Sequence, residues 1–340
     1  MKWHPGHYVT IMGWGKNSPK YLEDVYAELE ATPALRGVQI RYLWAELEPA
    51  EGRYDFTSID QWLAELAGQG KRLVIQVQTK SFDPSWTLVP DYLKASEYDG
   101  GAFAFGSQKK WERAAHNAMP RGYNIALWNP RVRDRLIALF QALGERYNSH
   151  PAFEGIGMIE TAFGEPLVPL SADKIDGFYT NLLHVHQQMR AQFPNTMRIQ
   201  EVNYPRPMLQ SFVRKLKEMG TALSSPDIFR DEPGLAMNTP NAPRGIYTYY
   251  PELSGIVPLA PQVMRSNYRN TRGDGTGAVP TVSEILAFVR DGLKANYIFW
   301  ARTPDDFPRV LEMLKKPTQT GNPSGGLASA CPKAYVSCVE

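Results

Sequence analysis

Short apolar runs alternate along this 340-residue chain with segments whose apolar residues recur every three to four positions. A short, almost wholly apolar run is typical of a strand buried on both faces, and the longer periodic segments are typical of helices with one apolar face. The expected strands cover residues 7–14, 38–44, 73–78, 153–160, 197–202, 221–224, 257–264 and 297–300.

Helical periodicity occupies most of the intervals between these runs. The expected helices cover residues 19–32, 59–67, 130–147, 175–193, 208–219, 282–293 and 307–314. Strands that alternate with helices indicate a parallel sheet with right-handed crossovers. We therefore predict a single (β/α)₈ TIM barrel with long βα loops over residues 1–316, followed by a small polar appendage or tail over residues 317–340.

Two segments interrupt the rhythm, residues 81–128 and 230–254, and both combine Gly and Pro with many aromatic residues. Loops of this length are usually functional. Aromatic faces suit the stacking of sugar rings, although Tyr and Trp in such loops also commonly pack over the barrel itself.

Composition narrows the class of protein. Hydrophobic residues make up 43 % and charged residues 21 %, as in a globular protein with a full core. The 37 basic and 35 acidic residues form no dense basic stripe, which argues against nucleic acid as a partner. No apolar run reaches the ~18 residues of a membrane span, so we expect a soluble protein.

Localisation and oligomeric state are left open by the sequence. The first residues, MKWHPGHYVT, contain no signal-peptide h-region, yet use outside the cell or at the cell envelope is compatible with the sequence. The two cysteines, Cys331 and Cys338, are close enough for a small disulfide loop, and two separate thiols fit the spacing equally well.

Carboxylates at strand ends are the candidate catalytic groups. The apolar run that starts at Phe153 ends at Glu160, and the carboxyl ends of barrel strands form the catalytic face. Glycoside hydrolysis needs one protonated carboxyl to assist the leaving oxygen and one ionised carboxyl to attack or to activate water. We assign the proton donor to Glu160, whose apolar neighbours would favour the neutral form, and the second carboxylate to Asp227.

Other roles for these groups stay open. Glu201 and Glu165 rival Asp227, Glu160 could instead pair with Arg41, and Asp227 could cap a turn or hold a nearby arginine. A separation of ~6.5–9.5 Å between the two catalytic carboxyls would imply inversion, and ~5 Å retention.

One stretch carries a family resemblance. The segment WAELEPAEGRYDFTSIDQWL, residues 44–63, resembles the W-x-x-x-EP-x-x-G-x-YDF-x-x-ID segment of several clan A glycoside hydrolases, the superfamily that includes cellulases and β-galactosidases. The resemblance implies a TIM barrel with Glu160 as acid/base, Arg41 as support for the nucleophile and Trp300 beneath the sugar.

The sequence departs from that clan at two places. Ile159 and Thr161 flank Glu160 where the clan usually has Asn and Pro. The clan's nucleophile is a Glu near the end of strand seven, whereas this chain has PQVM at residues 261–264. The standard double displacement is therefore in question.

Polar and aromatic residues near strand ends complete the predicted site. The expected substrate-binding residues are Arg41, Trp44, Gln78, Asn203, Tyr204, Tyr250, Gln262 and Trp300. We expect no cofactor and no metal, because His4 and His7 are not joined by the further His and Asp ligands of barrel metallohydrolases.

The sequence thus predicts a glycosidase that acts within an oligo- or polysaccharide chain. The alternatives are a sugar-binding barrel without activity, suggested by the missing strand-seven Glu, and a polysaccharide lyase.

Overall fold

A computed structural model describes the chain except for residues 12, 14, 107–118 and 317–320. Eight strands form one sheet in which every neighbouring pair is parallel. In sheet order they are β10 (Gln262–Val263), β11 (Tyr297–Ala301), β1 (Gly6–Ile11), β2 (Leu35–Leu43), β3 (Arg72–Gln78), β6 (Phe153–Met158), β8 (Met197–Glu201) and β9 (Ala222–Ser224).

The two edges of this sheet meet and close a barrel. Leu223 of β9 forms a parallel bridge with Leu259, just ahead of β10. The backbone N–H of Ala260 donates to the carbonyl of Leu223 at 2.9 Å, and that of Gln262 to Ser225 at 2.9 Å. The predicted single (β/α)₈ barrel is confirmed.

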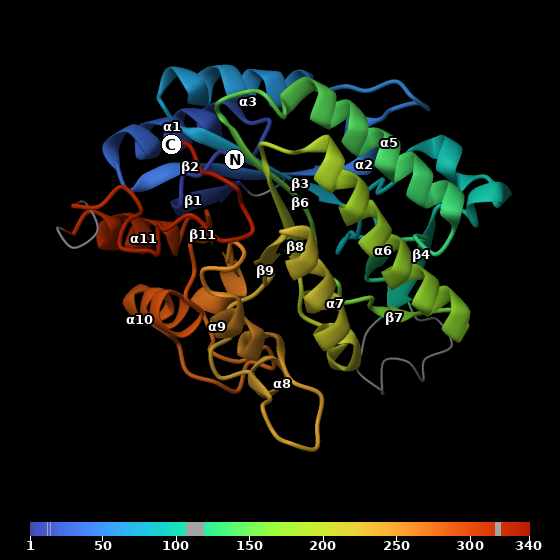
Figure 1. Ribbon diagram of the computed structural model, residues 1–340. Coiled ribbons are helices and arrows are strands. Elements are labelled where there is room, and N and C mark those ends of the chain that lie inside the picture. Colours follow the sequence, from blue (N-terminus) through green and yellow to red (C-terminus); the bar gives the residue numbers. More distant parts are fainter. Residues whose placement is uncertain (12, 14, 107–118, 317–320) are drawn as a thin grey trace.

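Helices cover the outside of the barrel (Figure 1). The longer ones are α1 (Pro19–Ala31), α3 (Thr57–Gly68), α5 (Pro130–Tyr147), α6 (Ala172–Gln192), α7 (Arg206–Met219) and α11 (Phe307–Leu314), and the shorter ones are α2 (Trp44–Leu47), α8 (Pro233–Ala236), α9 (Tyr249–Leu253) and α10 (Val282–Ala287). Each long helix buries one apolar stripe against the sheet, as Tyr21, Val25 and Leu29 do in α1. No helix in the described ranges is long and apolar enough to cross a membrane.

Several boundaries differ from those expected. Strand seven was expected over 257–264, but regular pairing is confined to Gln262–Val263, because Pro258 and Pro261 have no N–H to give to a sheet ladder. The helix expected over 282–293 is α-helical only to Ala287 and continues as a wider turn to Gly292. Residues 12 and 14, at the end of the expected first strand, lie outside the described part of the chain.

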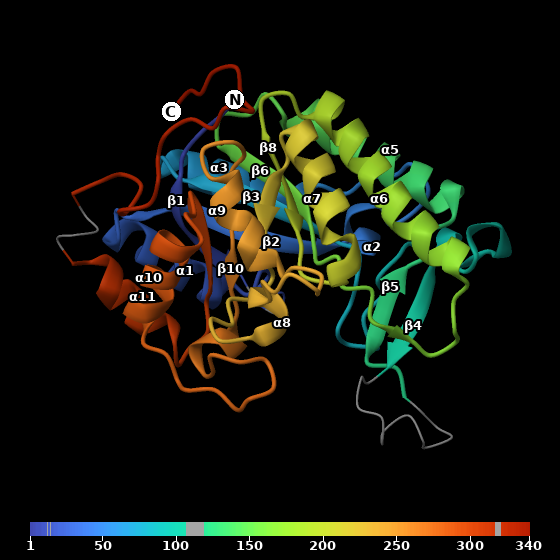
Figure 2. The same cartoon turned by 60° about the horizontal axis from the view of Figure 1, so that its bottom comes forward.

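The long segment after β3 builds a small sheet beside the barrel (Figure 2). β4 (Ala102–Gly106) pairs antiparallel with β5 (Gly122–Ile125) and with β7 (Glu165–Pro166), so the loop after β3 is joined to the loop after β6. Phe103 of β4 stacks on Phe163 with ring centroids 4.7 Å apart. Most loop aromatics here pack on one another, while Trp111 lies outside the described residues.

The C-terminal segment closes the amino-terminal end of the barrel. Both termini lie near each other there, in both ribbon views (Figures 1 and 2), and Lys2 forms a parallel bridge with Val339. The Trp3 indole donates to the carbonyl of Ser329 at 2.7 Å. Cys331 and Cys338 form a disulfide. Residues 321–340 are therefore an ordered plug on the face opposite to the strand carboxyl ends.

Candidate active site

A cavity of about 360 Å³ opens at the carboxyl ends of the strands. Residues from the loops after β1, β3, β6, β9 and β10 line it. Three carboxylates from three strand ends, Glu160, Glu201 and Asp227, belong to its wall. The barrel thus brings together groups that are far apart in the sequence.

Glu160 follows β6 and has both carboxylate oxygens occupied by donors. Lys80 Nζ donates to Oε1 at 2.5 Å, and Asn203 Nδ2 donates to Oε2 at 2.8 Å. The Glu160 side chain is 11 % exposed. One of these two hydrogen bonds is charge-assisted, because its donor is an ammonium group.

The ammonium of Lys80 is itself tightly enclosed. It lies 4.9 Å from the ring centroid of Phe82 and 4.7 Å from that of Phe105, and it donates to the carbonyl of Ala162 at 2.9 Å. Its side chain is 5 % exposed. The rings and the carbonyl hold the cation against Glu160, so the two charges form a fixed, largely desolvated pair.

Glu201 lies at the floor of the cavity. Its Oε1 accepts from Gln76 Nε2 at 2.8 Å and from Arg41 Nη2 at 3.4 Å. Burial raises the pKa of Glu201, and Arg41 opposes the shift. Oε2 is enclosed by protein and has no hydrogen-bond partner among the residues that the structure describes.

Arg41 joins this carboxylate to the strand-seven position. It donates to Gln262 Oε1 at 2.9 Å and to Gln76 Oε1 at 3.0 Å. Gln262 is fully buried. The arginine thus contacts Glu201 from β8 and the neutral amide of Gln262 on β10. The expected alternative, an ion pair between Arg41 and Glu160, is wrong, because Lys80 holds Glu160 instead.

Asp227 stands at the rim after β9 without a cation beside it in the described structure. Oδ1 accepts from Ser266 Oγ at 3.3 Å and from Asn267 Nδ2 at 3.4 Å. Burial first, and then repulsion from Glu160 and Glu201, raises the pKa of Asp227 to about 7. Its protonated and ionised forms are therefore both populated near neutral pH.

Among the described residues, the Asp227 side chain neither pairs with Arg230 nor caps a turn. The nearby Arg230 forms its ion pairs with Asp231 and Glu284. The backbone carbonyl of Asp227 accepts from Ser225 Oγ at 2.9 Å. The backbone is thereby anchored while the side chain faces the cavity.

A second cavity of about 340 Å³ adjoins the first, and Glu160 and Phe82 line both. Asn203, Tyr204 and the exposed Arg121 also line the second cavity, as does Glu165 on β7. Glu165 therefore lies on the outer side of Glu160 and outside the cavity that holds Asp227 and Glu201.

Three of the predicted sugar-binding aromatics lie in the interior. Trp44 is fully buried and donates to Glu48 Oε2 at 2.8 Å, while Trp300 donates to His7 Nδ1 at 3.0 Å. The Tyr250 side chain is fully buried as well. None of the three lines either cavity, so the structure does not support direct sugar contacts for them.

The other predicted binding residues divide between wall and floor. Gln78 and Arg41 line the first cavity and Asn203 and Tyr204 the second, whereas Gln262 lies beneath the floor. Sequence reasoning missed Lys80, although it follows the strand end at Gln78 by two residues and a rule for polar residues at strand ends would have found it.

Metal-ligating residues do not gather anywhere in the part of the chain that the structure describes. No group of three or more His, Cys, Asp or Glu side chains has a metal-binding arrangement there. The first cavity is lined by its three carboxylates, the amide of Gln78 and the guanidinium of Arg41, and the second cavity adds the cations Lys80 and Arg121.

Comparison with known structures supports the barrel. The chain superposes on a β-galactosidase from Bacillus circulans sp. alkalophilus with a TM-score of 0.62 and 10 % identity, covering 94 % of this chain and 56 % of that one. It superposes on the catalytic domain of β-amylase from Paenibacillus polymyxa with a TM-score of 0.57 and 9 % identity, covering 92 % and 98 %. The chain therefore shares a TIM-barrel fold with these two proteins.

Sequence comparisons cover less of the molecule. A family model described as beta-galactosidase matches residues 31–158. A β-galactosidase from Arthrobacter sp. is 31 % identical over 133 residues, which is 38 % of this chain and 17 % of that protein. The β-galactosidase BgaB of a Geobacillus species (strain Y412MC61) is 26 % identical over 148 residues, 42 % and 20 % respectively.

The family match does not reach the candidate catalytic carboxylates. The chain matches no more than a fifth of the length of these two relatives. The family match contains the segment 44–63 that carried the resemblance, but it ends two residues before Glu160.

Proposed function

We propose that this protein is a glycoside hydrolase that cleaves O-glycosidic bonds within a polysaccharide, with Glu160 and Asp227 as its catalytic carboxylates. The observation that carries the proposal is the contrast between two carboxylates of one cavity: both oxygens of Glu160 accept from donors, one of them the Lys80 ammonium, whereas burial and neighbouring charges raise the pKa of Asp227 to about 7. Hydrolysis of a glycoside requires that combination of one ionised and one protonated carboxyl.

This contrast assigns the roles differently from the sequence prediction. Lys80 and Asn203 donate to both oxygens of Glu160, so Glu160 suits the base or nucleophile that must be ionised. Asp227 has no such cation and keeps a proton up to about neutral pH, so it suits the general acid. We therefore propose Asp227 as the proton donor in place of Glu160.

Glu201 has a supporting role in this proposal. Its carboxylate lies at the floor of the first cavity and is bonded to Gln76 and Arg41, which suits a group that supports the other two carboxylates. Its negative charge helps to raise the pKa of Asp227. The charge thereby favours the protonated form of the proposed acid.

Cleavage within a chain is supported by the two cavities on either side of Glu160. Glu160 and Phe82 line both of them, so sugar units on both sides of a scissile bond could occupy adjoining cavities. The amides of Gln78 and Asn203 are placed to bond sugar hydroxyls.

Activity is tested first on a panel of microbial and plant polysaccharides by measuring new reducing ends. If the protein binds polymers but releases no product from any of them, the inactive carbohydrate-binding barrel is favoured. The neutral Gln262, which stands where a strand-seven Glu would be expected, supports that alternative. New ends that absorb in the ultraviolet would indicate a lyase.

The roles are tested by comparing Asp227→Asn and Glu160→Gln on the polymer and on an activated aryl glycoside. Loss of a general acid costs roughly 10²–10⁴-fold on a poor leaving group and far less on a good one. We expect Asp227→Asn to show this difference and Glu160→Gln to lose activity on both substrates. Glu312→Gln, at an exposed position of α11 that lines neither cavity, is the control and should keep both activities. The opposite pattern, with Glu160→Gln rescued by the aryl leaving group, would return the acid to Glu160.

A further inference from the structure

A groove separate from the catalytic cavities runs along α7. Helix α7 forms one wall, and residues 238–253, which include α9, form the other. Two adjoining cavities of about 370 and 480 Å³ make up the groove, and Pro207, Gln210, Arg244 and Tyr249 line both. Neither cavity shares a residue with those at Glu160.

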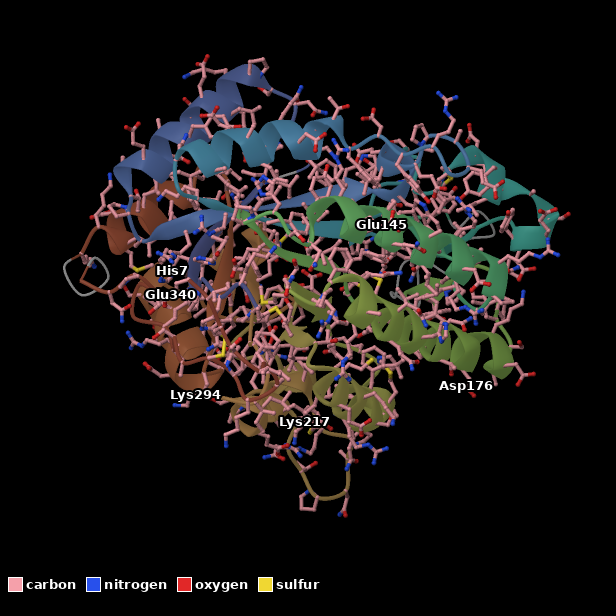
Figure 3. All side chains as sticks on the ribbon, turned by 45° about the horizontal axis from the view of Figure 1, so that its top comes forward. His7, Glu145, Asp176, Lys217, Lys294 and Glu340 are labelled. Carbon is pink, nitrogen blue, oxygen red and sulfur yellow. A yellow bond between two sulfur atoms is a disulfide. The ribbon has the colours of Figure 1, made fainter. Side chains whose placement is uncertain are left out.

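The helix wall carries a row of cations. Arg206, Arg214 and Lys217 line the groove together with Gln210, and their spacing of four, four and three residues places them on one helix face. Lys217 is labelled on α7 in Figure 3. None of the three cations forms an ion pair within the described structure, although Arg206 donates to the carbonyl of Pro243 at 3.1 Å.

The opposite wall does not neutralise these charges. Glu252 is the acidic residue that lines the groove, and it is already paired with Arg244. The described lining therefore has a net charge of about +3, in a protein whose formal charge is +2 overall. A groove lined by one sign of charge concentrates ligands of the opposite sign.

The groove begins close to the catalytic face. Tyr204 lines the second catalytic cavity, and α7 starts two residues later at Arg206. The 14 residues of α7 extend for about 20 Å along the barrel wall. A polymer strand that leaves the catalytic cavities past Tyr204 could therefore continue along the groove.

We propose that the α7 groove is a second glycan-binding site that takes an acidic polysaccharide, a sugar polymer that carries carboxylates. Arg206, Arg214 and Lys217 would pair with the carboxylates, while the amides of Gln210 and Asn238 would bond hydroxyls. The choice of a sugar polymer rests on the proposed glycosidase function.

Nucleic acid fits the groove less well, although it is also a polyanion. Proteins that bind single strands offer exposed aromatic faces on which bases stack. The aromatic residue of this groove, Tyr249, is buried, and the guanidinium of Arg244 covers its ring at 4.6 Å from the centroid.

The test is a binding titration that does not depend on hydrolysis. Polygalacturonate and its carboxyl-reduced neutral counterpart are titrated against the protein, with the Glu160→Gln variant used if either polymer is cut. The groove variant is Arg214→Gln/Lys217→Gln. The control is Lys315→Gln/Lys316→Gln, which removes two exposed cations at the end of α11 that do not line the groove.

We expect the intact protein to prefer the acidic polymer and the groove variant to bind it about 2- to 30-fold more weakly, as for the loss of two exposed ion pairs. The control variant should bind as the intact protein does, and added salt should reduce the difference. The groove variant should keep full activity on a short aryl glycoside that does not reach the groove.

Equal binding of the acidic and the neutral polymer, or unchanged binding by the groove variant, would overturn the proposal. Equally tight binding of a single-stranded oligonucleotide, lost in the same variant, would also overturn it by showing a surface for polyanions in general. Because binding is measured without turnover, these outcomes are distinct from a failure of the proposed hydrolase activity.

Discussion

The raised pKa of Asp227 predicts the shape of the activity profile against pH. The proposed acid must be protonated to assist the leaving group, and its pKa is about 7. At pH 8 about a tenth of Asp227 would be protonated, so kcat/KM on a polymer should fall about tenfold for each pH unit above 7. The basic limb of kcat/KM reports the free enzyme, which is the state described by the structure.

Two variants should move this limb in opposite directions. The charge of Glu201 raises the pKa of Asp227, whereas the hydrogen bond from Ser266 lowers it. Glu201→Gln should therefore shift the limb to lower pH, and Ser266→Ala should shift it to higher pH. One pKa unit corresponds to 1.36 kcal/mol. A hydrogen bond to a charged group contributes about 1.5–3 kcal/mol, and the 3.3 Å contact of Ser266 is long, so we expect a shift of up to about one unit.

The assay is kcat/KM from pH 5 to 9 for the intact protein and both variants, with thermal unfolding at each pH as a control for folding. An aryl glycoside with a good leaving group should show a much shallower limb, because it needs less proton assistance. A polymer profile that stays flat to pH 9, or a limb that moves the same way in both variants, would refute the assignment of Asp227 as the acid.

Two further predictions concern stability. His7 is fully buried, accepts from Trp300 at Nδ1 and donates from Nε2 to the carbonyl of Gly325 at 3.0 Å, and burial lowers its pKa to about 4 from an ordinary value of 6.5. Because the pKa of His7 is lower in the folded state, its contribution to stability is present above pH 6.5 and is lost as the pH falls to 4. For a shift of this size the loss is ~3 kcal/mol. His7→Gln should therefore make the free energy of unfolding depend less on pH over this window. Removing the disulfide with Cys331→Ser/Cys338→Ser should lower that free energy by ~2–3 kcal/mol, as expected for a short loop, while kcat/KM stays unchanged because the plug lies at the opposite end of the barrel. Chemical denaturation measures both, and a loss of activity without a loss of stability would show that the plug affects the site.

Periodicity alone was sufficient for the architecture. Each buried strand and each amphipathic helix has a local signature, because a side chain's direction depends on its position along the element. The eight strands, their order and seven of the helices that follow them were therefore predictable. The length of strand seven was overestimated, because an apolar run does not show whether its backbone N–H groups pair. Pro258 and Pro261 limit that pairing.

The expectation that catalytic groups lie at the carboxyl ends of barrel strands also located the carboxylates. Glu201 is the last residue of β8, Glu160 and Asp227 follow β6 and β9, and parallel strands present their carboxyl ends to one face. What each carboxylate could do was not predictable. A protonation state depends on donors and charges from other strands, and Lys80 meets Glu160 only because β3 and β6 are neighbours in the sheet.

Burial likewise depended on the tertiary structure. Trp44 and Trp300 stand near strand ends in the sequence, as residues of a sugar site would, but their rings point into the interior and bond Glu48 and His7. The sequence by itself determined the barrel and the face that carries its chemistry, since both follow from local periodicity and strand direction. Only the tertiary structure decided which carboxylate is paired, which keeps its proton and which aromatics reach the cavity, because these properties arise from contacts between residues that are distant in the chain.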